Sequence, residues 1–172
     1  MNRTVWRIIG RFALLMALQL LVLNYVYLGG YVMPMLYVLF ILMLPTGMKR
    51  IPLLLIAFGT GLLVDVMGNM RGFHALACTV VAMLRILFAD RILTRGEPVT
   101  IATPSVYSVT PQYFITYLLL MLGAFYLVFY TAELFGFRGF GGVLLATVCS
   151  TLVTTLLAVL YQVIFLKRKE ES

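Results

Sequence analysis

The stretch Ile51–Ala77, IPLLLIAFGTGLLVDVMGNMRGFHALA, decides the fold because two apolar runs in it flank a short polar turn. The first run contains one carboxylate, Asp65, and the turn region adds Arg71 and the only histidine, His74. A charged side chain inside lipid costs about 2.5–3.5 kcal/mol on insertion scales, so an ionisable residue at that depth is a candidate functional residue. The stretch therefore predicts two membrane helices joined by a turn.

The composition extends this interpretation to the whole chain. Hydrophobic residues make up 63% of the 172 positions and charged residues only 11%, a balance typical of spanning helices rather than of one soluble domain. Each crossing needs about 20 apolar residues to span a hydrocarbon core of roughly 30 Å. We expect an all-α integral membrane protein with a single transmembrane domain over residues 1–172.

The sequence divides into six apolar segments, at about 8–28, 31–44, 51–68, 73–93, 112–135 and 143–166. The second segment is short, because as a helix it would measure only about 21 Å, which also suits a re-entrant or interfacial piece. Six crossings with both termini in the cytoplasm leave only Arg71 and Arg138 outside, apart from the intramembrane Arg85. Because basic residues collect on the cytoplasmic side, we favour six crossings.

The net charge of +7 would suggest a nucleic-acid partner in a soluble protein. Here the basic residues gather in tails and short connections, a pattern typical of membrane topology. We therefore expect the lipid bilayer, and not nucleic acid, as the partner of these charges. The longest connection, residues 94–111, interleaves prolines with β-branched residues, which disfavours helix. It is interpreted as a cytoplasmic linker or as a docking strip for a cytoplasmic partner.

Catalytic chemistry lacks its usual components in this sequence. The carboxylates Asp65, Asp90 and Glu133 belong to three different segments, so no pair has the spacing for acid–base work. The two cysteines have neither metal-ligand nor CxxC spacing. We expect a protein that is not an enzyme and that holds no metal or cofactor.

Asp65 shares a helix face with Phe58 and Gly61, which lie two turns and one turn before it. Gly61 allows a neighbouring chain to come close to the carboxylate. Counting from Gly72 places Asp65 in the outer part of the membrane, within reach of the two basic side chains of the turn region. Two interpretations stay open: a hydrogen-bonded brace for the turn, and a contact with a partner or ligand.

Arg85 is the other charge within an apolar segment. It lies about 18 Å along the helix from Phe73, too deep to pair easily with Asp65. Its long stem allows the guanidinium to snorkel toward the cytoplasmic face. A membrane anchor is one interpretation, and a contact with a carboxylate of another subunit is the alternative.

Small residues recur at every fourth position of the last segment: Gly142, Ala146, Ser150, Thr154 and Ala158. This spacing lets helix backbones approach closely within a membrane. The sequence predicts a tight helix contact on this face, either inside the chain or with another chain. Ala13 and Ala17 form a shorter instance in the first segment.

A family resemblance begins in the stretch quoted first. That stretch is similar to the most recognisable part of the rod shape-determining protein MreD family: a proline, an apolar run, F-x-x-G-L-x-x-D, a short polar turn with glycine, and a small and apolar helix start. The matching residues are Pro52, Phe58, Gly61, Leu62, Asp65, Gly72, Ala75 and Leu76. Elsewhere the resemblance rests on length, six apolar segments and basic tails.

The resemblance implies a multi-pass protein of the bacterial inner membrane and a non-enzymatic scaffold subunit of the elongasome, which controls cell shape by inserting peptidoglycan. MreD-like proteins are thought to bind the bitopic protein MreC, and through it to link MreB filaments with RodA and a class B transpeptidase. The family is also similar in fold to S components of energy-coupling-factor transporters. This gives the alternative function, a vitamin-binding S component, in which the spacing of Ala13 and Ala17 would serve docking.

Overall fold

The computed structural model describes residues 3–21, 32–45, 48–94, 104, 110–133 and 140–167. Its helices are α1 (Arg3–Leu21), α2 (Val38–Leu42), α3 (Arg50–Gly68), α4 (Phe73–Thr94), α5 (Pro111–Glu133) and α6 (Phe140–Lys167). Among these residues, three helical stretches are long and apolar enough to cross a membrane: Arg50–Gly68, Pro111–Glu133 and Gly141–Phe165. The described chain is therefore all-helical and has the helices of a membrane protein, as the composition predicts.

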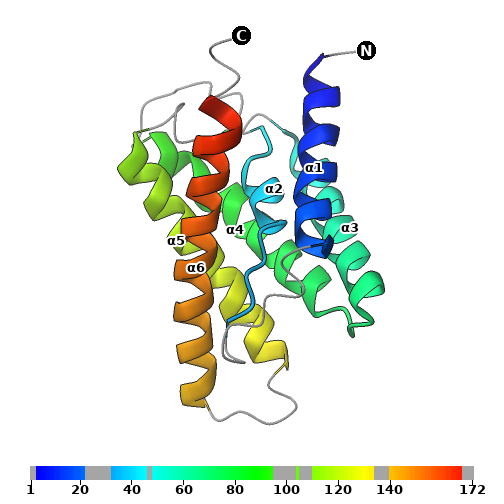
Figure 1. Cartoon of the computed structure of the whole chain (residues 1–172), viewed down its shortest axis with the longest axis vertical. Helices are drawn as coiled ribbons and strands as arrows, with labels where there is room; N and C mark the ends of the chain where they lie inside the picture. Colours follow the sequence, from blue (N-terminus) through cyan, green and yellow to red (C-terminus); the bar gives the residue numbers. More distant parts are fainter. Residues whose placement is uncertain are drawn as a thin grey trace.

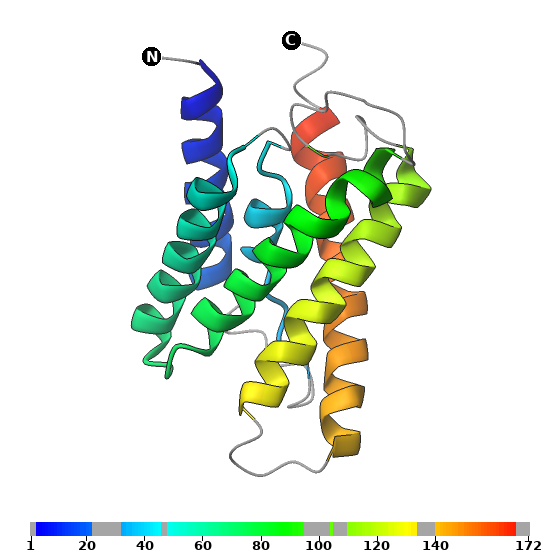
Figure 2. The same ribbon diagram turned by 180° about the vertical axis from the view of Figure 1, so that it is seen from behind.

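Helices α3 to α6 form a row in which each packs against the next along the chain. Figure 2 shows α4 running obliquely between α3 and α5, and Figure 1 shows α2 between α1 and this row. The start of α3 lies at the same end of the bundle as the end of α4 and the start of α5 (Figure 2). The short turn between α3 and α4 lies at the opposite end, so the chain runs up and down between the two ends.

The second segment differs from the prediction, which placed a helix over residues 31–44. Helix α2 covers only Val38–Leu42, and residues 33–35 before it are not helical. Extended chain advances about 3.3 Å per residue against 1.5 Å in a helix, so a segment too short for a helical crossing still runs along much of the bundle (Figure 1). All residues from Met35 to Leu44 are buried.

Side chains of α1 and α5 make this non-helical backbone tolerable inside an apolar bundle. Gln19 donates to the Pro34 carbonyl over 3.1 Å and accepts a hydrogen bond from the Leu36 N–H over 2.8 Å. The Tyr126 hydroxyl accepts one from the Met35 N–H, also over 2.8 Å. Irregular backbone is stable at membrane depth only where protein groups replace the missing water. These two polar side chains therefore hold the buried segment in place.

The remaining helices agree with the predicted segments to within a few residues, except at the first. Helix α1 begins at Arg3, earlier than the predicted start near residue 8. Its predicted continuation to residue 28 lies outside the described residues. Most of the connection over 94–111 lies outside them as well, so the linker and docking-strip interpretations stay predictions.

Candidate functional site

The turn between α3 and α4 depends on two residues with positive φ. Asn69 closes α3 with φ 52°, and Gly72 precedes α4 with φ 88°. Left-handed backbone is readily adopted by glycine and is tolerated by asparagine. The N–H groups of Asn69 and Met70 donate to the main-chain carbonyl of Asp65. The chain thus reverses within a few residues, and the reversal is tied to Asp65.

The Asp65 carboxylate binds the start of the next helix. It accepts hydrogen bonds from the His74 N–H at 3.2 Å and from the Ala75 N–H at 2.8 Å, and the residue is only 2% exposed. N–H groups in the first turn of a helix have no partner within that helix, and the positive end of the helix dipole favours an anion there. Asp65 therefore caps α4 from within α3.

Gly61 brings the two helices close enough for this cap. A Cβ atom at position 61 would lie 2.5 Å from the His74 carbonyl oxygen and 2.6 Å from the Ala75 Cα. Both neighbours are backbone atoms, which cannot rotate away as a flexible side chain can. Only glycine fits at this crossing, one turn before Asp65.

His74 connects the hairpin to the rest of the bundle. Its Nδ1 atom lies 3.9 Å from the nearer Asp65 oxygen and has no hydrogen-bond partner in the described ranges. The imidazole stacks on the Tyr37 ring, with ring centroids 5.9 Å apart, and it contacts the Phe129 ring of α5 at 4.6 Å. His74 thus combines a weak electrostatic contact with aromatic packing.

Phe58 and Arg71, the other two predicted side chains, lie on the outside of the hairpin. Phe58 is 47% exposed, so the predicted face shared with Gly61 and Asp65 does not bury all three residues. The reason is visible in Figure 2, where α3 and α4 separate with distance from the turn. Arg71 is exposed and makes no ion pair with Asp65 within the described part of the chain.

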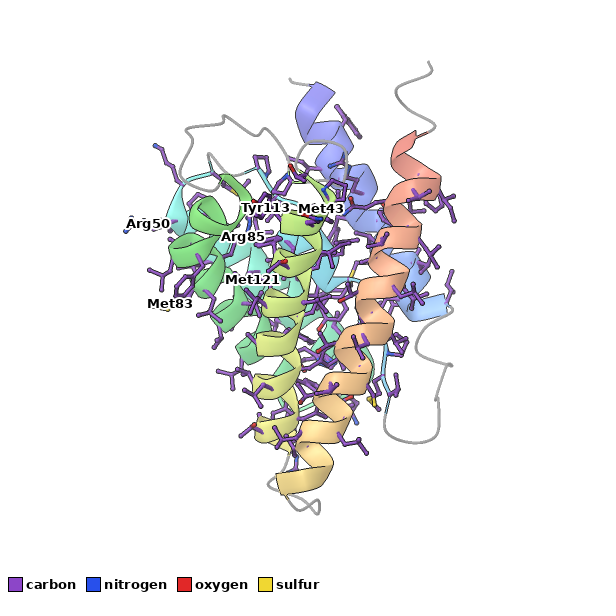
Figure 3. The ribbon with its side chains drawn as sticks, turned by 90° about the vertical axis from the view of Figure 1, so that its left-hand side faces the viewer. Met43, Arg50, Met83, Arg85, Tyr113 and Met121 are labelled. Carbon is purple, nitrogen blue, oxygen red and sulfur yellow. The ribbon has the colours of Figure 1, made fainter. Side chains whose placement is uncertain are left out.

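Arg85 occupies a separate buried position toward the opposite end of the bundle (Figure 3). It is 3% exposed, and its Nη2 atom donates to the Leu44 carbonyl just after α2. The Tyr117 hydroxyl interacts with the same guanidinium and donates to the Leu42 carbonyl over 3.3 Å. The side chain therefore turns inward, and the anchor and subunit-contact interpretations stay predictions.

The small face of α6 is used inside the chain. Ala146, Ser150, Thr154 and Ala158 are buried, and Gly142 is half-buried. The hydroxyls of this face meet tyrosines of α5, because Ser150 shares a 2.8 Å hydrogen bond with Tyr130 and Thr154 shares a 2.5 Å one with Tyr126. In contrast, Ala13 and Ala17 are exposed on the surface of α1.

Gln19 and Tyr126, which hold the non-helical segment, were not among the predicted site residues. Each had a signal in the sequence: Gln19 is an uncharged polar residue inside an apolar run, and Tyr126 lies one helical turn before Tyr130. Polar side chains in such runs commonly bond to neighbouring helices. Their partners could not be predicted, because these partners are backbone atoms of a segment that was predicted to be helical.

Together these observations define a chain whose described part is helical, with three helices long and apolar enough to cross a membrane, and whose α3–α4 hairpin is braced by a buried carboxylate. Within the described ranges, no three His, Cys, Asp or Glu side chains gather as metal ligands would. Comparison with protein-family models, with curated proteins and with solved structures finds no match to the chain.

Proposed function

We propose that this protein is a non-enzymatic scaffold subunit of a bacterial inner membrane, similar to MreD, which binds an MreC-like bitopic partner. Through that partner it would help to couple MreB filaments to RodA and a class B transpeptidase during cell-wall synthesis. One observation carries the proposal. Gly61, Asp65 and Gly72, which carry the family resemblance, act together in one hairpin, as the close crossing, the helix cap and the turn.

The hairpin divides these residues into an inner and an outer set. Asp65 and Gly61 are buried and hold the two helices together, so neither offers a side chain to a partner. Phe58 faces outward from the same helix, together with Leu62 and Val66. Aromatic side chains often contribute strongly to binding at protein interfaces. We assign the partner contact to this outer face, with the buried residues fixing its shape.

The test is capture of a coexpressed MreC-like bitopic protein by the tagged full chain from detergent-solubilised membranes. We expect the wild-type chain to capture the partner. Phe58→Ala should reduce the captured amount at least about five-fold, because loss of an interface anchor exceeds about 1 kcal/mol. Its matched control is Leu152→Ala on α6, which also removes an exposed apolar side chain and should leave capture unchanged.

Two results would count against this proposal. Absence of the partner from the wild-type complex would remove the scaffold function. Equal capture by wild-type protein and by folded Phe58→Ala protein would remove the contact from the outer face of α3. Size-exclusion profiles of both variants separate these results from simple misfolding.

The second candidate function is a substrate-binding S component of a vitamin transporter. One observation favours it: Ala13 and Ala17 are exposed on α1, where a coupling subunit has access to them. This function requires a bound small molecule, so native mass spectrometry of gently extracted protein separates the two candidates. A vitamin-sized adduct would support transport, and an added single-pass chain would support the scaffold.

A further inference from the structure

The guanidinium of Arg85 is a buried cation with too few partners. Its Nη2 atom donates to the Leu44 carbonyl, but among the described residues the Nε and Nη1 atoms have no hydrogen-bond partner. Those two nitrogens carry most of the N–H donors of the group. No carboxylate forms an ion pair with it in the part of the chain that the structure describes. A charge inside a membrane protein normally pairs with another group, so we expect this guanidinium to bind an anion.

Arg85 lies toward one end of the bundle, and lipid headgroups are expected beside the ends of membrane-spanning helices. Figure 3 shows Arg85 toward the same end of the bundle as Tyr113 and as Arg50, the first residue of α3. Tyr113 lies in the first turn of α5. Helix ends mark the boundary of the hydrocarbon core, where the polar headgroup region of the bilayer begins.

An apolar outer surface lies beside this position. Phe88 lies one helical turn after Arg85 on the same side of α4 and is 42% exposed, and Leu120 of α5 is 55% exposed. Met83 and Leu87, two residues on either side of Arg85, face away from it. Figure 3 shows Met83 pointing away from the bundle. Such a surface suits acyl chains, and basic pockets between membrane helices bind anionic headgroups. The cation and the apolar surface together match the two parts of one phospholipid.

We propose that Arg85 is the anchor of a binding site for a phosphate-bearing anion, the headgroup of an anionic phospholipid. Guanidinium groups suit phosphate because their planar array of donors matches several phosphate oxygens. The Tyr117 hydroxyl lies beside the same group and can add a further donor if it leaves the Leu42 carbonyl. Inorganic phosphate shares this chemistry, so the test separates the two sources.

The experiment is native mass spectrometry of the full chain in neutral detergent with equimolar phosphatidylglycerol and phosphatidylcholine. We expect wild-type protein to retain one phosphatidylglycerol at least about ten-fold more often than phosphatidylcholine, corresponding to about 1.4 kcal/mol. Arg85→Gln should abolish this preference. The control is Arg50→Gln, which removes an exposed cation from the same end of the bundle and should keep the preference.

A second arm adds inorganic phosphate at millimolar concentration without lipid. Phosphate binding by the wild-type chain in this arm, together with equal retention of the two lipids in the first arm, would support the anion site and assign it to free phosphate. Equal retention of both lipids by wild-type protein, with no phosphate binding, would overturn the proposal. An unchanged preference in folded Arg85→Gln protein would overturn it as well.

Arg85→Lys serves if the glutamine variant does not fold. A lysine keeps the charge but offers a compact ammonium in place of the planar fork. We expect it to retain phosphatidylglycerol with occupancy reduced several-fold. Full wild-type occupancy in Arg85→Lys would show that the guanidinium is not the anchor.

Discussion

Asp65 and Arg85 are buried to nearly the same extent, at 2% and 3% exposed, but their partners differ. The Asp65 carboxylate receives two main-chain N–H groups at the positive end of α4. Within the part of the chain that the structure describes, the Arg85 guanidinium has one carbonyl and a neighbouring hydroxyl, and two of its nitrogens lack partners. Burial therefore does not separate a structural charge from a functional one. The completeness of the partner set does.

From the sequence, Asp65 was the more prominent candidate for a partner contact, and the partner sets now favour Arg85 instead. Asp65 carries the family resemblance and first attracts attention as a contact residue. In the structure its charge is fully used within the hairpin, so its effect on any partner must pass through the shape of α3 and α4. Arg85, interpreted from the sequence as an anchor or a subunit contact, is the charge left open to a ligand.

The largest effect is expected from Gly61→Ala, which tests whether the Asp65 cap depends on the close crossing. The added Cβ would collide with the backbone of α4 at His74 and Ala75. Overpacking of this kind destabilises by about 3 kcal/mol. The measurement is unfolding in mixed detergent micelles, followed by circular dichroism.

Gly59→Ala is the matched control for this substitution, because position 59 lies on the same helix with open space around its Cβ. Alanine there should stabilise the protein by about 0.5–1 kcal/mol, since glycine is the poorer helix former. Equal stability changes for the two variants would show that the hairpin does not require a glycine at the crossing.

A smaller effect is expected from Asp65→Ala, which removes the carboxylate that accepts both main-chain hydrogen bonds. Loss of a helix cap of charge-assisted hydrogen bonds should destabilise by about 2 kcal/mol. The amide N–H groups of His74 and Ala75 should then exchange with deuterium faster than in wild-type protein, because they lose their acceptors. Hydrogen exchange read by mass spectrometry on peptides covering the turn and the start of α4 measures this change.

Asp65→Asn separates the charge from the hydrogen bonds. The amide oxygen can still accept from one N–H group, so we expect roughly half of the alanine effect, about 1 kcal/mol. An asparagine variant as stable as wild-type protein would mean that the negative charge contributes nothing at the helix terminus. Unchanged exchange in Asp65→Ala would contradict the cap itself.

The hairpin could be predicted from the sequence because its determinants are local. The apolar runs fix the two helices, and the glycine at position 72 with the polar residues before it marks the turn. Asp65 lies within ten residues of both N–H groups that it binds, so helix geometry alone brings them near one another. The brace, one of the two interpretations left open for Asp65, is the arrangement that the structure contains.

The second segment and Arg85 could not be predicted in this way because their contacts are distant in sequence. Met35 bonds to Tyr126 across 91 positions, and Arg85 bonds to Leu44 across 41. Hydrophobic periodicity indicates which residues are apolar, but it does not indicate that Gln19 and Tyr126 supply hydrogen bonds for a non-helical backbone. A helix over residues 31–44 was the default expectation for an apolar run, and tertiary hydrogen bonds overrode it.

The smallest effect on stability is expected from Arg85→Gln, and it is the sharpest test of the difference between the two charges. Neutralising a buried charge with an incomplete partner set removes a desolvation penalty along with the hydrogen bond to Leu44. These two contributions oppose each other, so we expect a change within about 1 kcal/mol in neutral detergent. The same unfolding measurement applies. A loss as large as that of Asp65→Ala would mean that Arg85 is as fully matched as Asp65, and the distinction between a structural carboxylate and an open cation would fail.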